Sequence, residues 1–244
     1  MICVNVPADF DVYLFGEWII MLIYGHRGAS AIEPENTIRA FTRALEMGAS
    51  GLEFDVQASS DRVPVLIHDR QLDRTTNGTG NVDEFPLTSL KRLDAGQGER
   101  MPTLAEALDV IGDRAHLDIE MKQGGIERET LVVLHAHPAA RWAISSFDWE
   151  VLRTIRTLDA SAELWMLAVE VSEAVLDTAT QIGATGVALH SGGLTEASSK
   201  RLLDAGLKII IWTVNDVETA RRCRDLGAFG LCTDAPAIIL AGLA

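Results

Sequence analysis

The sequence has few cysteines and no long apolar run. Only three of its 244 residues are cysteine (Cys3, Cys223 and Cys232), an odd number with no metal-ligand spacing, which indicates a reducing compartment. We therefore expect a cytoplasmic protein. No stretch of about 18 apolar residues is available to span a membrane, so we expect no stable membrane anchoring.

Positive charge is also scarce. The chain carries 21 Lys and Arg against 35 Asp and Glu, which gives a formal net charge of −14. This balance disfavours a general nucleic-acid surface, so we expect no nucleic-acid partner, and any anionic substrate must be attracted locally by a metal or a few placed cations. The remaining composition, 48% apolar and 23% charged, is typical of a globular protein with a large core.

The first twenty residues lack Lys and Arg, and with them the positive start of a secretory signal. Met21 stands immediately before the first convincing strand. We expect residues 1–20 to be a loosely held N-terminal extension and residues 21–244 to form a single domain. An extra strand or helix that plugs one end of the fold is the alternative.

Apolar strands alternate with helical segments along the rest of the chain. Strands are expected to start near residues 22, 51, 117, 142, 163, 186, 208 and 230, and the later helices to cover about 127–137, 147–158, 173–182, 196–205 and 216–226. Eight such strands predict an α/β fold, a (β/α)8 TIM barrel. An open doubly wound sheet is the alternative, but no Gly-rich phosphate fingerprint follows the first strand.

A β-hairpin is expected after the second barrel strand. Only Ser59-Ser60-Asp61-Arg62 separates that strand from the next apolar run, and a parallel crossover needs roughly a dozen residues. An antiparallel return would bring His68 level with Glu53 and Asp55. Residues 70–101 look irregular and are expected to form a small insertion.

Polar side chains gather at the predicted C-terminal ends of three strands. Side chains two residues apart share one face of a strand, and barrel chemistry is performed at the C-terminal ends. The residues placed there are His26, Arg27, Glu53, Asp55, Glu120 and Lys122.

Three of these residues are carboxylates that would repel one another in a single pocket. A cation or protonation must compensate such a cluster. The oxygen ligands of Glu53, Asp55 and Glu120 favour one hard divalent cation, Mg²⁺ or Ca²⁺. Ordinary ion pairing, for example of Glu120 with Lys122, is the alternative.

Two histidines on neighbouring segments fit a general acid and base. His26 and His68 each end an apolar strand close to the predicted carboxylates. Arg27 and Lys122 supply fixed positive charge suited to phosphate oxygens. With no Ser or Cys elbow as a covalent nucleophile, the set indicates phosphate-ester chemistry.

The chain resembles the glycerophosphodiester phosphodiesterases over residues 22–238, nearly its whole length. The motifs that carry the resemblance are His26-Arg27-Gly28, Pro34-Glu35-Asn36-Thr37, Glu53-x-Asp55, His68-Asp69, Asp73-Arg74-Thr75-Thr76, Glu120-x-Lys122, Trp212-Thr213-Val214-Asn215 and Thr233-Asp234-x-Pro236.

The resemblance implies a (β/α)8 barrel and the roles of the site residues. His26 and His68 match the acid/base pair, and Arg27 and Lys122 match phosphate contacts. Trp212 matches a wall of the glycerol pocket. The metal ligands of the family match Glu53, Asp55 and Glu120.

The implied reaction converts a small-molecule glycerophosphodiester and water into sn-glycerol 3-phosphate and an alcohol. The glycerol 2-hydroxyl would attack first and give a cyclic phosphate. A lysophospholipase D-like enzyme that acts on lipids is the alternative. A catalytically dead binding protein is a third possibility, against which the complete residue set argues.

Three further polar residues have structural interpretations. For Asn36, capping of the first helix and a contact with the site both stay open. Asp234 is expected to tie down the final turn rather than to act in chemistry. His190 ends a strand on the site face, where a packing role is favoured over a substrate contact.

Overall fold

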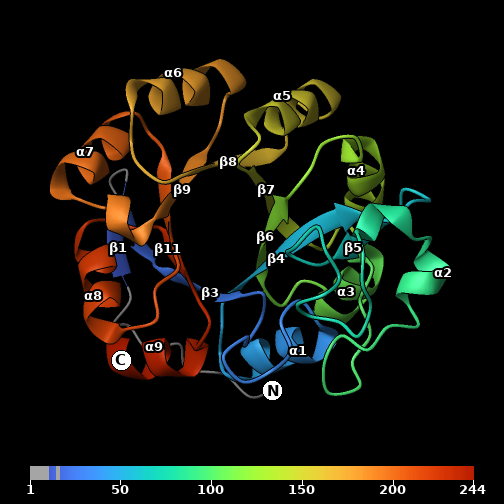
Figure 1. The fold of residues 1–244 in the computed structure, drawn as a ribbon. Coiled ribbons are helices and arrows are strands. Elements are labelled where there is room, and N and C mark those ends of the chain that lie inside the picture. Colours follow the sequence, from blue (N-terminus) through green and yellow to red (C-terminus); the bar gives the residue numbers. More distant parts are fainter. Residues whose placement is uncertain (1–10, 15–16) are drawn as a thin grey trace.

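Eight parallel strands close into a barrel in the computed structural model, which describes the backbone of residues 11–14 and 17–244 and the side chains from Met21 onward (Figure 1). The first strand pairs with both the last and the second, which closes the barrel. The predicted TIM barrel is thereby confirmed. Its strands are β3 (Leu22–His26), β4 (Gly51–Ala58), β6 (His116–Met121), β7 (Arg141–Ser146), β8 (Glu163–Ala168), β9 (Gly186–His190), β10 (Lys208–Trp212) and β11 (Gly230–Thr233).

Helices between the strands form a ring around the barrel (Figure 1). Ser172, Thr195 and Asp216 cap their helices with side-chain oxygens, as predicted. The last helix, α9, was not among the expected elements. The ring consists of α1 (Ile38–Glu46), α3 (Leu104–Ile111), α4 (Glu127–His135), α5 (Trp149–Leu158), α6 (Glu173–Ile182), α7 (Glu196–Asp204), α8 (Val217–Asp225) and α9 (Pro236–Leu243), with a short 3₁₀ turn η3 (Ser191–Gly193) before α7.

The hairpin after the second barrel strand is present. Strand β5 (Pro64–Leu66) runs antiparallel to β4, and the Ile67 amide donates to the Asp55 carbonyl at 3.1 Å. The chain therefore returns toward the site, as the short connection predicted. The insertion that follows contains η2 (Val82–Glu84) and α2 (Leu87–Leu90). It packs around its own apolar cluster of Val65, Ile67, Leu72, Val82, Leu90 and Met101.

The predicted N-terminal extension lies partly outside the described residues, because 1–10 and 15–16 are not described. Within it, β1 (Asp11–Leu14) and β2 (Glu17–Ile20) pair as an antiparallel two-stranded sheet of their own. The division of the chain into an extension and a barrel domain stays a prediction.

The barrel interior is apolar below the site. Tyr24, Trp165 and Ile210 are completely buried there, and the Tyr24 hydroxyl lies 3.0 Å from His116 Nδ1. This packed floor leaves the C-terminal ends of the strands as the place where polar side chains collect. Within the described part of the chain, no helix is both long enough and apolar enough to span a bilayer.

Candidate active site

Strand register brings the predicted site residues together. His26 on β3 pairs with Glu53 on β4, and Asp55 on β4 pairs with Glu120 on β6. Because alternate residues of a strand point inward, these four side chains share the interior of the barrel at its C-terminal end.

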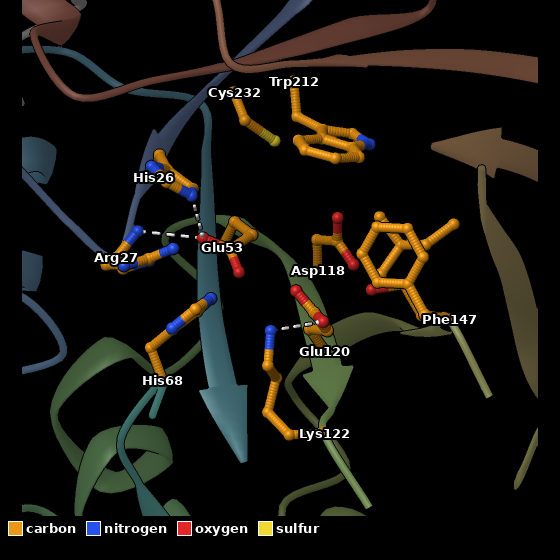
Figure 2. A pocket seen from close by; sticks show the side chains of 12 residues that line it. His26, Arg27, Glu53, His68, Asp118, Glu120, Lys122, Phe147, Trp212 and Cys232 are labelled. Atoms are coloured by element: carbon orange, nitrogen blue, oxygen red, sulfur yellow. Dashed lines mark hydrogen bonds and ion pairs between the residues drawn. The ribbon is translucent and has the colours of Figure 1, made fainter. Parts of the chain in front are cut away.

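One pocket at this end collects nearly all the predicted residues (Figure 2). The exception is Asp55, which is completely buried beside it. Figure 2 shows Arg27 and both histidines on one side and Trp212 and Phe147 on the other. The lining residues are His26, Arg27, Glu53, His68, Asp118, Glu120, Lys122, Ser145, Phe147, Leu167, Trp212 and Cys232.

The three carboxylates of the site form a compact oxygen cluster. One oxygen each from Glu53, Asp55 and Glu120 lies within 4.8 Å of the other two. Burial, with repulsion from Asp55, raises the pKa of Glu53 and of Glu120. Burial also acts to raise the pKa of Asp55, but the charges of Lys122 and Arg27 outweigh it and lower that pKa.

This cluster fits a hard divalent cation. The Oδ1 atom of Asp55 is buried without a hydrogen-bond partner, and its nearest ion-pair contact is Lys122 Nζ at 3.4 Å. Lys122 Nζ is 2.6 Å from Glu120, and Arg27 Nε is 3.3 Å from Asp55. An unpartnered carboxylate oxygen within an all-oxygen set is the donor arrangement that Mg²⁺ and Ca²⁺ take.

Each histidine is held by a carboxylate through the same ring nitrogen. His26 Nδ1 lies 2.6 Å from Asp234 Oδ1, and His68 Nδ1 lies 2.6 Å from Asp69 Oδ1. His26 Nε2 is 3.9 Å from Glu53 Oε2, on the pocket side of the ring. This pairing leaves Nε2 of each imidazole available for proton transfer.

Asp234 contributes more than the final turn that the sequence suggested. Ser30 and Asn215 hold its carboxylate by hydrogen bonds of 3.0 and 2.6 Å, beside His26. Burial opposes ionisation, but these bonds and the one to His26 lower the pKa of Asp234 to about 2. The available signal was its place after the last barrel strand, which closes onto β3.

A chain of ion pairs supports the other histidine. Arg74 binds Asp69 and Glu35 at 2.6 Å each, and Glu35 also accepts from Arg27 at 2.9 Å. Hydrogen bonds from Arg74, and then from His68, lower the pKa of Asp69 against the effect of burial. Asp69 and Arg74 belong to two of the motifs identified in the sequence, but the sequence alone did not predict that they support His68.

Asn36 does not cap the first helix. Thr37 does so, by accepting from the Ala40 amide. Asn36 instead donates to Asp55 Oδ2 at 2.8 Å and accepts from the Asp55 amide at 3.2 Å. Its backbone is left-handed, with φ of 57°, a strained conformation that Asn tolerates and that turns the side chain toward the site.

The wall opposite the histidines is largely aromatic. Trp212 donates from Nε1 to the Ala188 carbonyl at 2.9 Å, and Phe147 meets its ring edge-on at 5.5 Å between centroids. His190 packs against Trp212 and accepts from the Gly192 amide, away from the pocket lining.

Asp118 is a site residue that the sequence analysis missed. It is buried, lines the pocket and lies two residues before Glu120 on β6. Burial raises the pKa of Asp118 to about 7; the adjacent Ser145 hydroxyl opposes this shift, and the charges of Glu120 and Asp55 add to it. The period of two that selected Glu120 and Lys122 would also have selected Asp118.

Comparison with known proteins decides the family. The model of the glycerophosphoryl diester phosphodiesterase family matches residues 26–238. The chain belongs to this family, whose members are phosphoric diester hydrolases. It is 35% identical to a glycerophosphodiester phosphodiesterase of Caldanaerobacter subterraneus subsp. tengcongensis over 90% of this chain and 96% of the relative. It is also 30% identical to a glycerophosphodiester phosphodiesterase of Bacillus subtilis, over 88% of this chain and 84% of the relative.

A solved structure with the same fold carries a product. It is a phosphodiesterase of Oleispira antarctica in complex with sn-glycerol-3-phosphate, similar to this chain with a TM-score of 0.87 and 30% identity. The match covers 91% of this chain and 96% of the other. The barrel and the family predicted from the sequence are thus confirmed.

Proposed function

We propose that this member of the family hydrolyses small glycerophosphodiesters to sn-glycerol 3-phosphate and an alcohol. The observation that carries the proposal is the pair of carboxylate-held histidines beside the cluster of Glu53, Asp55 and Glu120. The product bound to the Oleispira antarctica relative supports the same substrate class. The named relatives are glycerophosphodiester phosphodiesterases, so the lysophospholipase D-like alternative is not favoured.

We assign Glu53, Asp55 and Glu120 as ligands of one divalent cation, Mg²⁺ or Ca²⁺. When bound, the cation supplies Lewis-acid charge that stabilises negative charge developing on the phosphate. Arg27 and Lys122 lie against the same carboxylates and supply fixed charge to phosphate oxygens. The oxygen donors of the cluster and the unpartnered Asp55 oxygen support this assignment.

The two histidines would work as an acid/base pair. One imidazole removes the proton of the glycerol 2-hydroxyl, whose oxygen forms a bond to phosphorus. The bond from phosphorus to the leaving oxygen breaks, and the other imidazolium protonates that oxygen. Water then opens the cyclic phosphate with the two roles reversed. Asp234 and Asp69 hold the rings in orientation throughout. An internal nucleophile avoids the entropic cost of a bimolecular attack.

The pocket walls suggest how the substrate lies. The phosphate is placed between Arg27 and Lys122, and the glycerol group lies against Trp212. The leaving alcohol then points out of the pocket. The net charge of −14 fits a small substrate held by local cations and no nucleic-acid partner, and we propose a cytoplasmic enzyme on the cysteine content.

The test is an assay with glycerophosphocholine, glycerophosphoethanolamine and a lysophospholipid. A chelator should abolish turnover of the first two, and Mg²⁺ or Ca²⁺ should restore it. His26→Ala and His68→Ala should each lose at least about 100-fold in kcat. His135→Gln, an exposed histidine on α4, is the matched control and should retain full activity. Normal turnover by either alanine variant would refute the acid/base pair, and preference for the lysophospholipid would refute the substrate class.

A further inference from the structure

A polar groove lies beside the active-site pocket and shares two of its walls. It has a volume of about 530 Å³ and is lined by Gln57, His68, Arg70, Asp83, Lys122 and Gln123. His68 and Lys122 also line the active-site pocket, and Figure 2 shows them at the edge of that pocket opposite Trp212. The two spaces therefore meet beside the proposed catalytic histidine and the proposed phosphate contact. The groove is large enough to hold a small ligand group.

Two barrel strands and the insertion build the groove. Gln57 lies on the same face of β4 as the carboxylates of the metal cluster, is buried, and donates from Nε2 to the His68 carbonyl at 2.8 Å. The Lys122 amide donates to the Val56 carbonyl at 3.1 Å, which holds the segment after β6 against β4. These hydrogen bonds fix the wall that the groove shares with the active-site pocket.

The insertion contributes two charged side chains on a fixed frame. The amide of Val82, a buried member of the insertion's apolar cluster, donates to the Arg70 carbonyl at 2.9 Å. Asp83 follows directly, and its Oδ2 atom accepts from Arg70 Nη2 at 3.0 Å. The Arg70 side chain is 68% exposed, and a guanidinium has five N–H donors, so further donors remain for a ligand. This wall is organised before any ligand binds, which lowers the entropic cost of binding.

The chemistry of the lining favours an alcohol that carries several hydroxyl groups. Arg70 and Lys122 are two cations against the one carboxylate of Asp83, and no Phe, Tyr or Trp of the described chain belongs to the lining. A quaternary ammonium group is therefore disfavoured, because aromatic rings are what recognise it. The amide of Gln123, half-buried in the groove, offers both donors and an acceptor. A hydroxyl group also donates and accepts, so amide and guanidinium groups complement it.

We propose that this groove binds the leaving alcohol of the substrate and favours a neutral polyhydroxy alcohol, such as a second glycerol. This inference rests on the proposed function and names the class of its substrate. With the glycerol group against Trp212 and the phosphate beside Lys122, the leaving alcohol extends past His68 into the groove. Its hydroxyl groups then bind Arg70 and Gln123.

The experiment compares three substrates that differ only in the leaving alcohol. Glycerophosphoglycerol carries the hydroxyl groups, glycerophosphopropanol has the same three carbons without them, and glycerophosphocholine carries a cation in their place. The full chain is assayed with Mg²⁺ or Ca²⁺ for release of sn-glycerol 3-phosphate, and kcat/KM for glycerophosphoglycerol is divided by the value for each of the others. The intrinsic reactivity of each ester is the same for every variant, so a change in these two ratios reports recognition of the leaving alcohol.

Two substitutions remove the hydrogen-bonding groups at the groove and keep the side-chain length. Arg70→Met and Gln123→Met should each lower both ratios about 2- to 10-fold, the range for the loss of one hydrogen bond. The double variant should lower them about 10-fold or more. Gln181→Met is the matched control, since Gln181 is exposed on the outer helix α6, and it should leave both ratios unchanged.

Three results overturn the proposal. Unchanged ratios in the double variant would show that the groove does not contact the leaving alcohol. An equal loss on all three substrates would indicate a general role in the site. A larger loss on glycerophosphocholine than on glycerophosphoglycerol would indicate a groove for cationic alcohols. A wild-type enzyme that hydrolyses none of the three would refute the proposed function itself and is distinguishable from each of these.

Discussion

Asp234 is expected to control turnover through His26 and to leave substrate affinity unchanged. Its Oδ1 atom lies 2.6 Å from His26 Nδ1, while Ser30 and Asn215 fix the carboxylate from other directions. Asp234 does not itself line the pocket. Asp234→Asn keeps the volume but removes the charge, and its amide can donate to Nδ1. That donation favours the tautomer whose Nε2 carries the proton and cannot act as base.

The size of the effect follows from the hydrogen bond that is changed. A bond to a charged partner contributes about 1.5–3 kcal/mol. If this is expressed mainly in the transition state, kcat should fall about 10- to 100-fold, with KM within about threefold of wild type.

The same carboxylate also links stability to pH. Its pKa falls from 3.8 to about 2 on folding, equivalent to roughly 2 kcal/mol. Because 32% of the side chain is exposed, we reduce this to about 1 kcal/mol. A lowered folded-state pKa means that the stabilisation is complete above pH about 4 and disappears as the pH falls toward 2.

The assay combines steady-state kinetics on glycerophosphocholine with urea unfolding at pH 7 and pH 2.5. Asp177→Asn, on the outer helix α6, is the matched control and should behave as wild type. The stability gap between Asp234→Asn and wild type should be present at pH 7 and clearly smaller at pH 2.5, which is still above the folded-state pKa of about 2. Unchanged kcat, or a raised KM with unchanged kcat, would refute the positioning role.

Three further predictions concern the shell of the site and the fold. Asn36→Ala removes both side-chain hydrogen bonds to Asp55 and should weaken Mg²⁺ binding about 10- to 100-fold, as measured by calorimetry. Asn36→Gly removes the same hydrogen bonds but tolerates the positive φ, so it should weaken binding equally. Wild-type Mg²⁺ affinity in the Gly variant would contradict the role of Asn36 in orienting Asp55. Burial opposes ionisation of Glu163, but His116 and Lys208 lower its pKa to about 2, so its stabilisation is present above pH about 4.5 and is lost toward pH 2. Glu163→Gln should therefore flatten the stability profile between pH 5 and pH 2, and a profile parallel to wild type would exclude this contribution. Gly28→Ala should lower the free energy of unfolding by about 3 kcal/mol or more, because φ is 86° and the new Cβ would lie 2.6 Å from Ala40. Gly112→Ala is the control: φ is 61° but no atom lies within 4 Å of the new Cβ, so it should lose only about 1 kcal/mol. Equal losses of the two variants in urea unfolding would contradict the steric argument.

The barrel and the ends of its strands were predictable because they depend on local patterns. A period of two in Glu53-x-Asp55 and Glu120-x-Lys122 identified inward-facing positions, and a four-residue link forced the hairpin that returns His68. The same rule applied to the first half of β6 would have found Asp118. The period of two along β6 is therefore sufficient to place Asp118 on the same face as Glu120.

The supporting contacts were not predictable from local patterns. Asp234 is 208 residues from His26 in the chain, and the contact exists only because β11 pairs with β3. Asn36 and Thr37 are both good helix caps, so only the left-handed backbone of Asn36 separates their roles. Long-range closure of the barrel and the backbone conformation of Asn36 therefore decide contacts that local sequence patterns leave open.

The two histidines consequently depend on different parts of the fold. Asp69 follows His68 directly in the chain, and Arg74 is only five residues further on, so this support is local. The support of His26 requires the last strand to stay paired with the first. Any loosening of β11 that leaves the rest of the barrel folded should therefore disable His26 while His68 keeps its partner. The proposed acid/base pair would then lose one member, at the point where the last strand pairs with the first.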